Sequence, residues 1–125
     1  HKNHISGFLE TKKAGKIFYR SSWERDVALF LDNIDYVESF SLEEFILDYC
    51  FSGETKFTRI DFMINFKNGK SLMIEVKPKT LQTIPVNIAK IQSYINYCKS
   101  NNIDFLLVDE TNRKKLNEVL LCYQN

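Results

Sequence analysis

Apolar residues recur along the chain with two different periods, and together these predict a layered α/β fold. After Ser21 they follow helical spacing as far as Ile34, and Glu24 stands three residues beyond Ser21, the spacing of a capping box at a helix start. Isoleucines at steps of four and three predict a second helix over 84–100 with a buried isoleucine face. A third helix is predicted near 112–122.

Other segments have the shorter period or the continuous apolarity of β-strands. Strands are predicted over 36–40, 44–50, 58–66 and 70–77, with turn signals at Ser52-Gly53 and Asn68-Gly69. The apolar run from Ile103 to Val108 is typical of a central strand covered on both faces. We expect the order α-β-β-β-α-β-α around a mixed sheet, in a single domain over residues 1–125 that begins with a loosely structured basic segment over residues 1–20.

The alternation within 58–77 predicts how its two strands pair. A two-residue turn at Asn68-Gly69 would set the apolar face of one strand beside the polar face of the other, which burial disfavours. A three-residue loop with Gly69 in the left-handed conformation instead pairs Phe66 with Lys70. The expected pairs are then, on the apolar face, Ile60 with Val76, Phe62 with Ile74 and Ile64 with Leu72 and, on the other face, Met63 with Met73 and Asp61 with Glu75.

This register sets two carboxylates side by side. Carboxylates directly opposite each other on a sheet repel, by a few tenths to about 1 kcal/mol, and a cation between them removes the repulsion. Oxygens from Asp61 and Glu75, together with water, suit octahedral Mg²⁺ or Mn²⁺, and Lys77 projects from the same face toward any bound phosphate. The alternative is an exposed sheet face on which Lys77 and Arg59 only balance the acids, because surface charge pairing is common.

Charge is unevenly distributed along the chain. Seventeen Lys and Arg against sixteen Asp and Glu leave a net charge of +1, which argues against a strongly basic, histone-like protein. Residues 26–55, however, hold eight acidic residues and no Lys or Arg, and basic residues outnumber acidic ones on both sides of that stretch. Two basic segments are therefore available to nucleic acid, unless the charge runs are only ordinary solvated surface.

Cysteine usage and hydropathy indicate the cellular setting. Cys50, Cys98 and Cys122 are widely spaced in apolar segments, which favours buried, reduced thiols over a zinc site or disulfides. No apolar run approaches the roughly 20 residues of a membrane span. We expect a cytoplasmic protein without membrane association.

The motifs around the two acids resemble those of a known family. Asp61 followed by Glu75-Val76-Lys77 on adjacent strands resembles the signature of the PD-(D/E)xK nuclease superfamily, whose core has the same element order. The segment Tyr19-Arg20-Ser21-Ser22-Trp23-Glu24 resembles the start of the catalytic domain of TnsA-like transposon endonucleases and related phage nucleases. The strand motifs Thr58-Arg59-Ile60-Asp61-Phe62 and Ile74-Glu75-Val76-Lys77-Pro78 are similar to those of the same group, so the resemblance spans about 16–110.

The resemblance implies a three-layer, restriction-endonuclease-like fold and a Mg²⁺- or Mn²⁺-dependent DNA endonuclease. Asp61 and Glu75 would hold the metal, Glu24 would join them from the first helix, and Lys77 would stabilise the transition state. We expect that helix to pack over Met63 and Met73, on the acidic face. The implied settings are phage DNA processing, mobile-element or homing-type cleavage, or junction cleavage, by a homodimer or with a partner specificity subunit.

Further residues are candidates for contacts with DNA, and two other functions stay open. The candidates are Lys16, Arg20, Arg59, Lys79 and Gln92. One alternative is a catalytically inactive nuclease-like fold that binds DNA or a protein, which the presence of all four site residues disfavours. The other is a protein-interaction domain without nucleic acid, which would make the charge segregation accidental.

Overall fold

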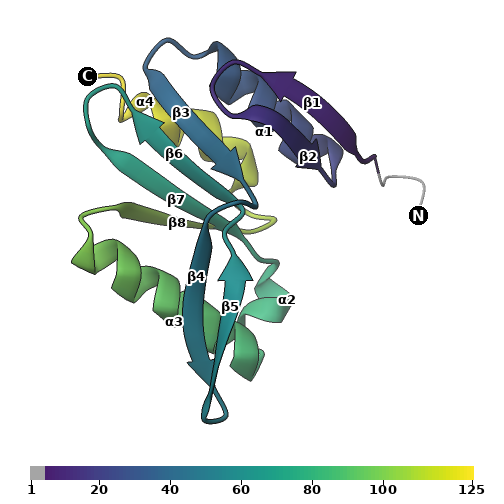
Figure 1. Ribbon diagram of the computed structural model, residues 1–125, viewed down its shortest axis with the longest axis vertical. Helices are drawn as coiled ribbons and strands as arrows, with labels where there is room; N and C mark the ends of the chain where they lie inside the picture. The colour runs from purple at the N-terminus through teal and green to yellow at the C-terminus, as the bar shows by residue number, and fades with distance from the viewer. Residues whose placement is uncertain (1–4) are drawn as a thin grey trace.

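A four-stranded mixed sheet forms the centre of the molecule in the computed structural model, which describes residues 5–125 (Figure 1). The strands lie in the order β3 (Val37–Leu42), β6 (Phe62–Phe66), β7 (Ser71–Val76) and β8 (Asp104–Val108). β6 runs antiparallel to β3 and β7, whereas β8 runs parallel to β7. The predicted α/β class and mixed sheet are thus confirmed.

Helices bury both faces of this sheet. α1 (Ser22–Asn33) and α4 (Leu116–Leu121) share one hydrophobic cluster with the side chains of Phe62, Ile64 and Ile74. α3 (Pro85–Ser100) covers the other face, where Tyr94 and Cys98 pack on Met63 and Met73. Neighbouring residues of one strand enter opposite clusters because strand side chains alternate between faces. α2 (Lys79–Gln82) follows β7, and a 3₁₀ turn, Arg113–Lys115, precedes α4.

The predicted register of the central hairpin is confirmed over its paired length. Phe62 faces Ile74, Met63 faces Met73 and Ile64 faces Leu72. At the turn, Gly69 has φ +90°, and the N–H of Phe66 donates to the carbonyl of Lys70 at 2.9 Å. The ladder ends at Phe62, so the expected backbone pairs Asp61 with Glu75 and Ile60 with Val76 do not form. Instead, the Val76 N–H donates to the Asp61 carboxylate at 2.7 Å.

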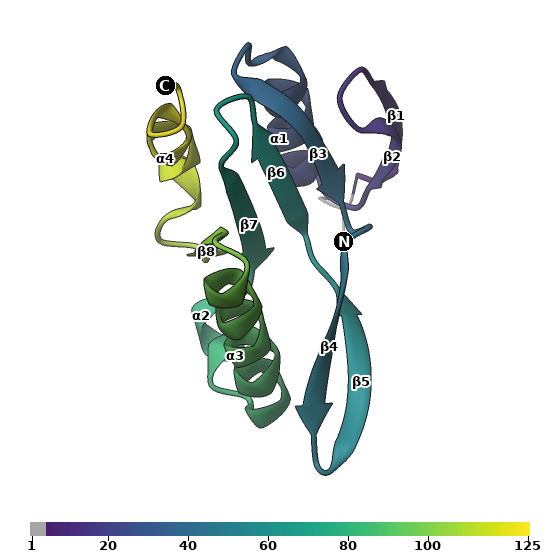
Figure 2. The same ribbon diagram turned by 60° about the vertical axis from the view of Figure 1, so that its left-hand side comes forward.

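The predicted strand over 58–66 is divided in two, which was not foreseen. β5 (Glu54–Arg59) pairs with β4 (Ile46–Phe51) in a separate hairpin, and the chain enters the central sheet only at Phe62. At the break, the N–H of Ile60 donates to the carbonyl of Phe45 at 2.8 Å. The β4–β5 hairpin therefore extends past the end of the sheet, where β4 packs beside α3 (Figure 2). Asp61 occupies the junction between the two sheets.

The predicted loose structure over 1–20 is wrong for residues 7–19, while residues 1–4 lie outside the described part. β1 (Gly7–Thr11) and β2 (Gly15–Tyr19) form a hairpin that packs on α1 (Figure 1). The buried carboxylate of Asp32, on α1, accepts the N–H groups of Lys12 and Lys13 at the hairpin turn, at 2.9–3.1 Å. This long-range contact stabilises the turn of a hairpin whose sequence shows little periodicity.

The predicted buried face of α3, made of four isoleucines and Cys98, is confirmed as fully buried only at Cys98. Tyr94 and Cys98 are the residues of α3 buried on the sheet, whereas Ile84, just before α3, and Ile88 are 40% and 51% exposed. Tyr94 can be buried because its hydroxyl donates to Thr58 Oγ1 at 3.2 Å, which satisfies its polar end.

The thiols differ in burial, contrary to expectation: Cys98 is buried, but Cys50 and Cys122 are exposed. All three are unpaired. Separately, no helix among residues 5–125 is long and apolar enough to cross a membrane.

Candidate active site

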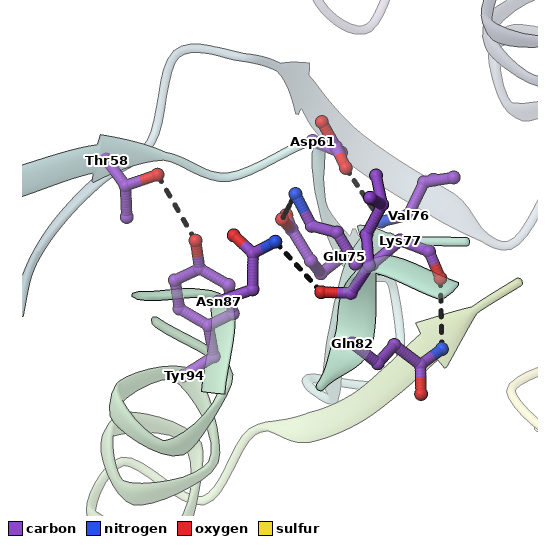
Figure 3. A network of polar contacts seen from close by, with 9 residues as sticks. Thr58, Asp61, Glu75, Val76, Lys77, Gln82, Asn87 and Tyr94 are labelled. Carbon is purple, nitrogen blue, oxygen red and sulfur yellow. Dashed lines mark hydrogen bonds and ion pairs between the residues drawn. The ribbon is translucent and has the colours of Figure 1, made fainter. Parts of the chain in front are cut away.

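Carboxylates from four segments converge where β6 begins and β7 ends. Glu24 comes from the first turn of α1, Glu43 follows β3, Asp61 precedes β6, and Glu75 lies near the end of β7. One oxygen from each of Glu24, Glu43 and Asp61 lies within 4.8 Å of the other two. Glu75 is close enough to Asp61 for their charges to repel. Glu75 also forms an ion pair with Lys77 (Figure 3). Of the three acids selected from the sequence, Glu24 and Asp61 are therefore brought together with Glu43, and Glu75 lies near Asp61 but outside that trio.

Glu75 is the most deeply buried member of this group. Its side chain is 7% exposed, and its Oε1 has no hydrogen-bond partner among the described residues. Its Oε2 lies 4.0 Å from the ammonium of Lys77, whose side chain is 20% exposed. An unsatisfied buried acceptor costs about 1–3 kcal/mol, and more if it is charged. The oxygen is thus available to a ligand that supplies positive charge.

Burial and mutual repulsion raise the pKa values of these acids. Burial, followed by the charge of Asp61, raises the pKa of Glu75 to about 8. Burial also raises the pKa of Asp61, although the Val76 N–H opposes the rise, and burial raises the pKa of Glu24. The site therefore retains a proton at neutral pH when no cation is bound. A divalent cation would compete with that proton for the same oxygens.

Metal-free protein should lose stability as pH rises from about 4.5 toward 8. Over that range the folded state holds a proton on Glu75 that the unfolded chain has released, so the free energy of unfolding falls with pH. One such proton gives a slope of at most about 1.4 kcal/mol per pH unit. Urea unfolding in EDTA at several pH values measures the slope. Glu75→Gln should flatten it and be more stable than the wild type at pH 8, and parallel wild-type and variant profiles would contradict the assignment.

The capping of α1 positions Glu24. The N–H of Glu24 donates to Ser21 Oγ at 3.1 Å, which confirms Ser21 as the N-cap, and the Glu24 carboxylate accepts the backbone N–H of Arg20 at 2.7 Å. The expectation that this helix covers Met63 and Met73 is wrong, because α3 occupies that face. Glu24 still approaches Asp61 because its carboxylate extends from the first turn of α1 at the end of the sheet.

Glu43 is the residue of this group that sequence reasoning missed. Its backbone has φ +55°, and its N–H lies 3.1 Å from the carbonyl of Ile60 and 3.0 Å from that of Asp61. Its carboxylate pairs with the Arg20 guanidinium at 2.8 Å. In the sequence Glu43 is one of eight acids in 26–55, and nothing there marks the strand break that brings it to Asp61.

The candidate DNA contacts fall into two groups. Arg20 and Arg59 lie at the acidic cluster, since Arg20 pairs with the Glu43 carboxylate and Arg59 donates to the Glu43 carbonyl at 3.3 Å. The other three make contacts elsewhere. The ammonium of Lys16 lies 4.9 Å from the centre of the Phe8 ring, the N–H of Lys79 donates to Glu110, and the Gln92 amide donates to Asn96. Arg20 and Arg59 are thus the two candidates with a contact to a residue of the acidic cluster.

Comparison with known proteins identifies the family of the chain. The family model for the TnsA-like endonuclease N terminal matches residues 34–110, which is more than half of the chain. The matched segment contains Glu43, Asp61, Glu75 and Lys77 and begins after Glu24. No curated protein matches the chain. The chain belongs to the TnsA-like endonuclease N-terminal family, and its function is, in general terms, that of a nuclease.

Proposed function

We propose that the protein is a metal-dependent DNA endonuclease that hydrolyses phosphodiester bonds. The observation that carries the proposal is the buried Oε1 of Glu75, which has no hydrogen-bond partner among the described residues and lies near Asp61. The Lys77 ammonium lies 4.0 Å from the other oxygen of the same carboxylate. Retaining such an oxygen is costly for a domain that only binds, but it suits a site that takes up a cation. Carboxylate oxygens are the donors that Mg²⁺ and Mn²⁺ prefer. The residues present therefore fit the cofactor that the family implies.

Asp61, Glu75 and Glu24 would hold the ion. Bound there, Mg²⁺ or Mn²⁺ would lower the pKa of a water molecule and offset negative charge on the phosphodiester. The Lys77 ammonium remains partly exposed, so it can donate to a non-bridging phosphate oxygen while its charge balances Glu75. Arg20 and Arg59 would fix the DNA backbone beside the acids, with more distant contacts from Lys16, Lys79 and Gln92.

The fold is proposed to be the three-layer, restriction-endonuclease-like core. In support, the strands of the central sheet and the longer helices follow in the order α1, β3, β6, β7, α3, β8, α4, with the hairpins as additions. One such site cuts one strand, so we further propose that double-strand cleavage uses a second copy or a partner subunit. The proposed settings are intracellular: phage DNA processing, or cleavage of mobile elements or junctions.

A plasmid assay tests this function. Supercoiled DNA is incubated with the protein and Mg²⁺ or Mn²⁺, and a parallel reaction contains EDTA. We expect conversion to nicked or linear DNA with metal and none with EDTA. Retarded migration of DNA in a gel without nicking in either metal would indicate a binding module, and the absence of DNA binding at low salt would exclude a nucleic-acid function.

A further inference from the structure

We propose that Glu43 is a fourth carboxylate of the metal site and binds the divalent ion directly. The inference rests on the proposed function and adds a residue that the motif does not contain. Glu43 shares the position of the candidate ligands, because one of its oxygens lies within 4.8 Å of oxygens from Glu24 and Asp61. A side chain at this spacing can share a cation with those two acids.

The backbone of Glu43 is fixed to the segment that carries Asp61. Its N–H points at two successive carbonyls, those of Ile60 and Asp61, at 3.1 and 3.0 Å. The two acids therefore keep their relative position through the main chain rather than through flexible side chains alone. Such pre-organisation reduces the entropy that a cation must overcome when it gathers its ligands.

The site also has more acceptor oxygens than donors. Each of Glu24, Glu43 and Asp61 accepts an N–H donor on one oxygen, from Arg20, Arg20 and Val76 respectively. The second oxygen of each acid receives no N–H from residues 5–125, and the buried Oε1 of Glu75, whose carboxyl interacts with Asp61, has no partner at all. A cation with several oxygen ligands would satisfy this set, which the chain itself does not.

The competing explanation is that Glu43 serves only as the partner of Arg20. That ion pair joins side chains that are 60% and 23% exposed, and such pairs contribute little on their own. The two explanations differ in what happens when Glu43 is changed. If Glu43 serves only as the partner of Arg20, Glu43→Gln lowers metal affinity no more than the loss of another nearby negative charge does. If Glu43 is a ligand, Glu43→Gln lowers that affinity further.

Calorimetric titration with Mn²⁺, without DNA, separates these cases. We expect Glu43→Gln to bind Mn²⁺ about 10-fold or more weakly than the wild type, while Arg20→Gln binds at least as tightly as the wild type. Glu44→Gln, an exposed neighbour with the same loss of charge, controls for long-range electrostatics. An affinity for Glu43→Gln within twofold of that for Glu44→Gln would overturn the inference. If the wild type itself binds no Mn²⁺ and cuts no plasmid, the proposed function fails with it.

A second measurement needs no variant. Fe²⁺ bound in place of Mg²⁺, with ascorbate and peroxide, generates oxidants that cut the polypeptide beside the ion, and mass spectrometry locates the cuts. We expect cuts near residues 43, 61 and 75. Cuts near 61 and 75 without any near 43 would place the ion away from Glu43 and contradict its assignment while leaving the proposed function intact.

Discussion

Asp61→Asn should lower the rate of plasmid cleavage by roughly 1,000-fold or more. Asp61 lies between the end of β7 and the acids Glu24 and Glu43. Its carboxylate accepts the Val76 N–H at 2.7 Å, and one of its oxygens lies within 4.8 Å of oxygens from those two acids. Asparagine keeps the size but removes the charge that attracts a divalent ion. The ion supplies several kcal/mol of transition-state stabilisation, and each 1.4 kcal/mol is tenfold in rate. A variant that no longer holds the ion should therefore lose nearly all cleavage activity.

The matched control for this variant is Asp48→Asn. Asp48 is exposed on β4, in the same acidic stretch, and makes no contact with the candidate site. The Asp48→Asn variant should cleave plasmid at the wild-type rate. Cleavage by Asp61→Asn at more than one tenth of the wild-type rate, with Mg²⁺ present, would show that Asp61 does not hold the ion.

Lys77→Met should lower cleavage about 100-fold and leave Mn²⁺ affinity unchanged or tighter. Methionine keeps the length of the side chain but removes the ammonium, which lies 4.0 Å from Glu75 Oε2. Removing a preorganised donor from developing negative charge typically costs about 100- to 1,000-fold in rate. Removing a positive charge beside the acids does not weaken the attraction for a cation. Cleavage rate and metal affinity are thus expected to separate in this variant, unlike in Asp61→Asn.

Lys70→Met is the comparison for Lys77→Met. Lys70 is exposed in the turn at the opposite end of β7, so its loss changes the net charge equally without affecting the site. Wild-type rates for Lys70→Met combined with reduced rates for Lys77→Met would assign the effect to the site. Equal cleavage by both variants would remove Lys77 from the mechanism.

Strand alternation was sufficient to predict the centre of the fold and part of its site. Because side chains alternate with a period of two, the three-residue loop aligns the apolar faces of 62–66 and 71–74 whereas the two-residue turn does not, and the register of the three-residue loop forms. The same reasoning brought Asp61 and Glu75 to one end of the hairpin, although the ladder stops one residue before the pair that it predicted. The Ser21 cap was predictable as well, because a capping signal depends on residues only three apart.

The features that were missed depend on contacts between distant residues. The β1–β2 hairpin is held by Asp32, about 20 residues further along the chain. The buried face of α3 includes Tyr94, whose hydroxyl donates to Thr58 on a distant strand, and the spacing of the isoleucines does not signal this contact. Glu43 reaches the site because the β-strand is interrupted at Ile60 and Asp61, whose carbonyls lie beside the Glu43 N–H. No local sequence pattern signals this interruption. The periodicity of apolar residues describes one helix or strand at a time, so it does not predict contacts between distant elements.

The most direct test of the metal centre is an anomalous difference map from a crystal soaked in Mn²⁺. We expect a peak about 2.0–2.3 Å from carboxylate oxygens of Asp61 and Glu75, with the Oε1 of Glu75 among the ligands. A peak at that position would identify the buried, unpartnered oxygen as a metal ligand. A map in which Mn²⁺ binds elsewhere, while Glu75 keeps only its neighbours Asp61 and Lys77, would show that these acids do not form the metal centre.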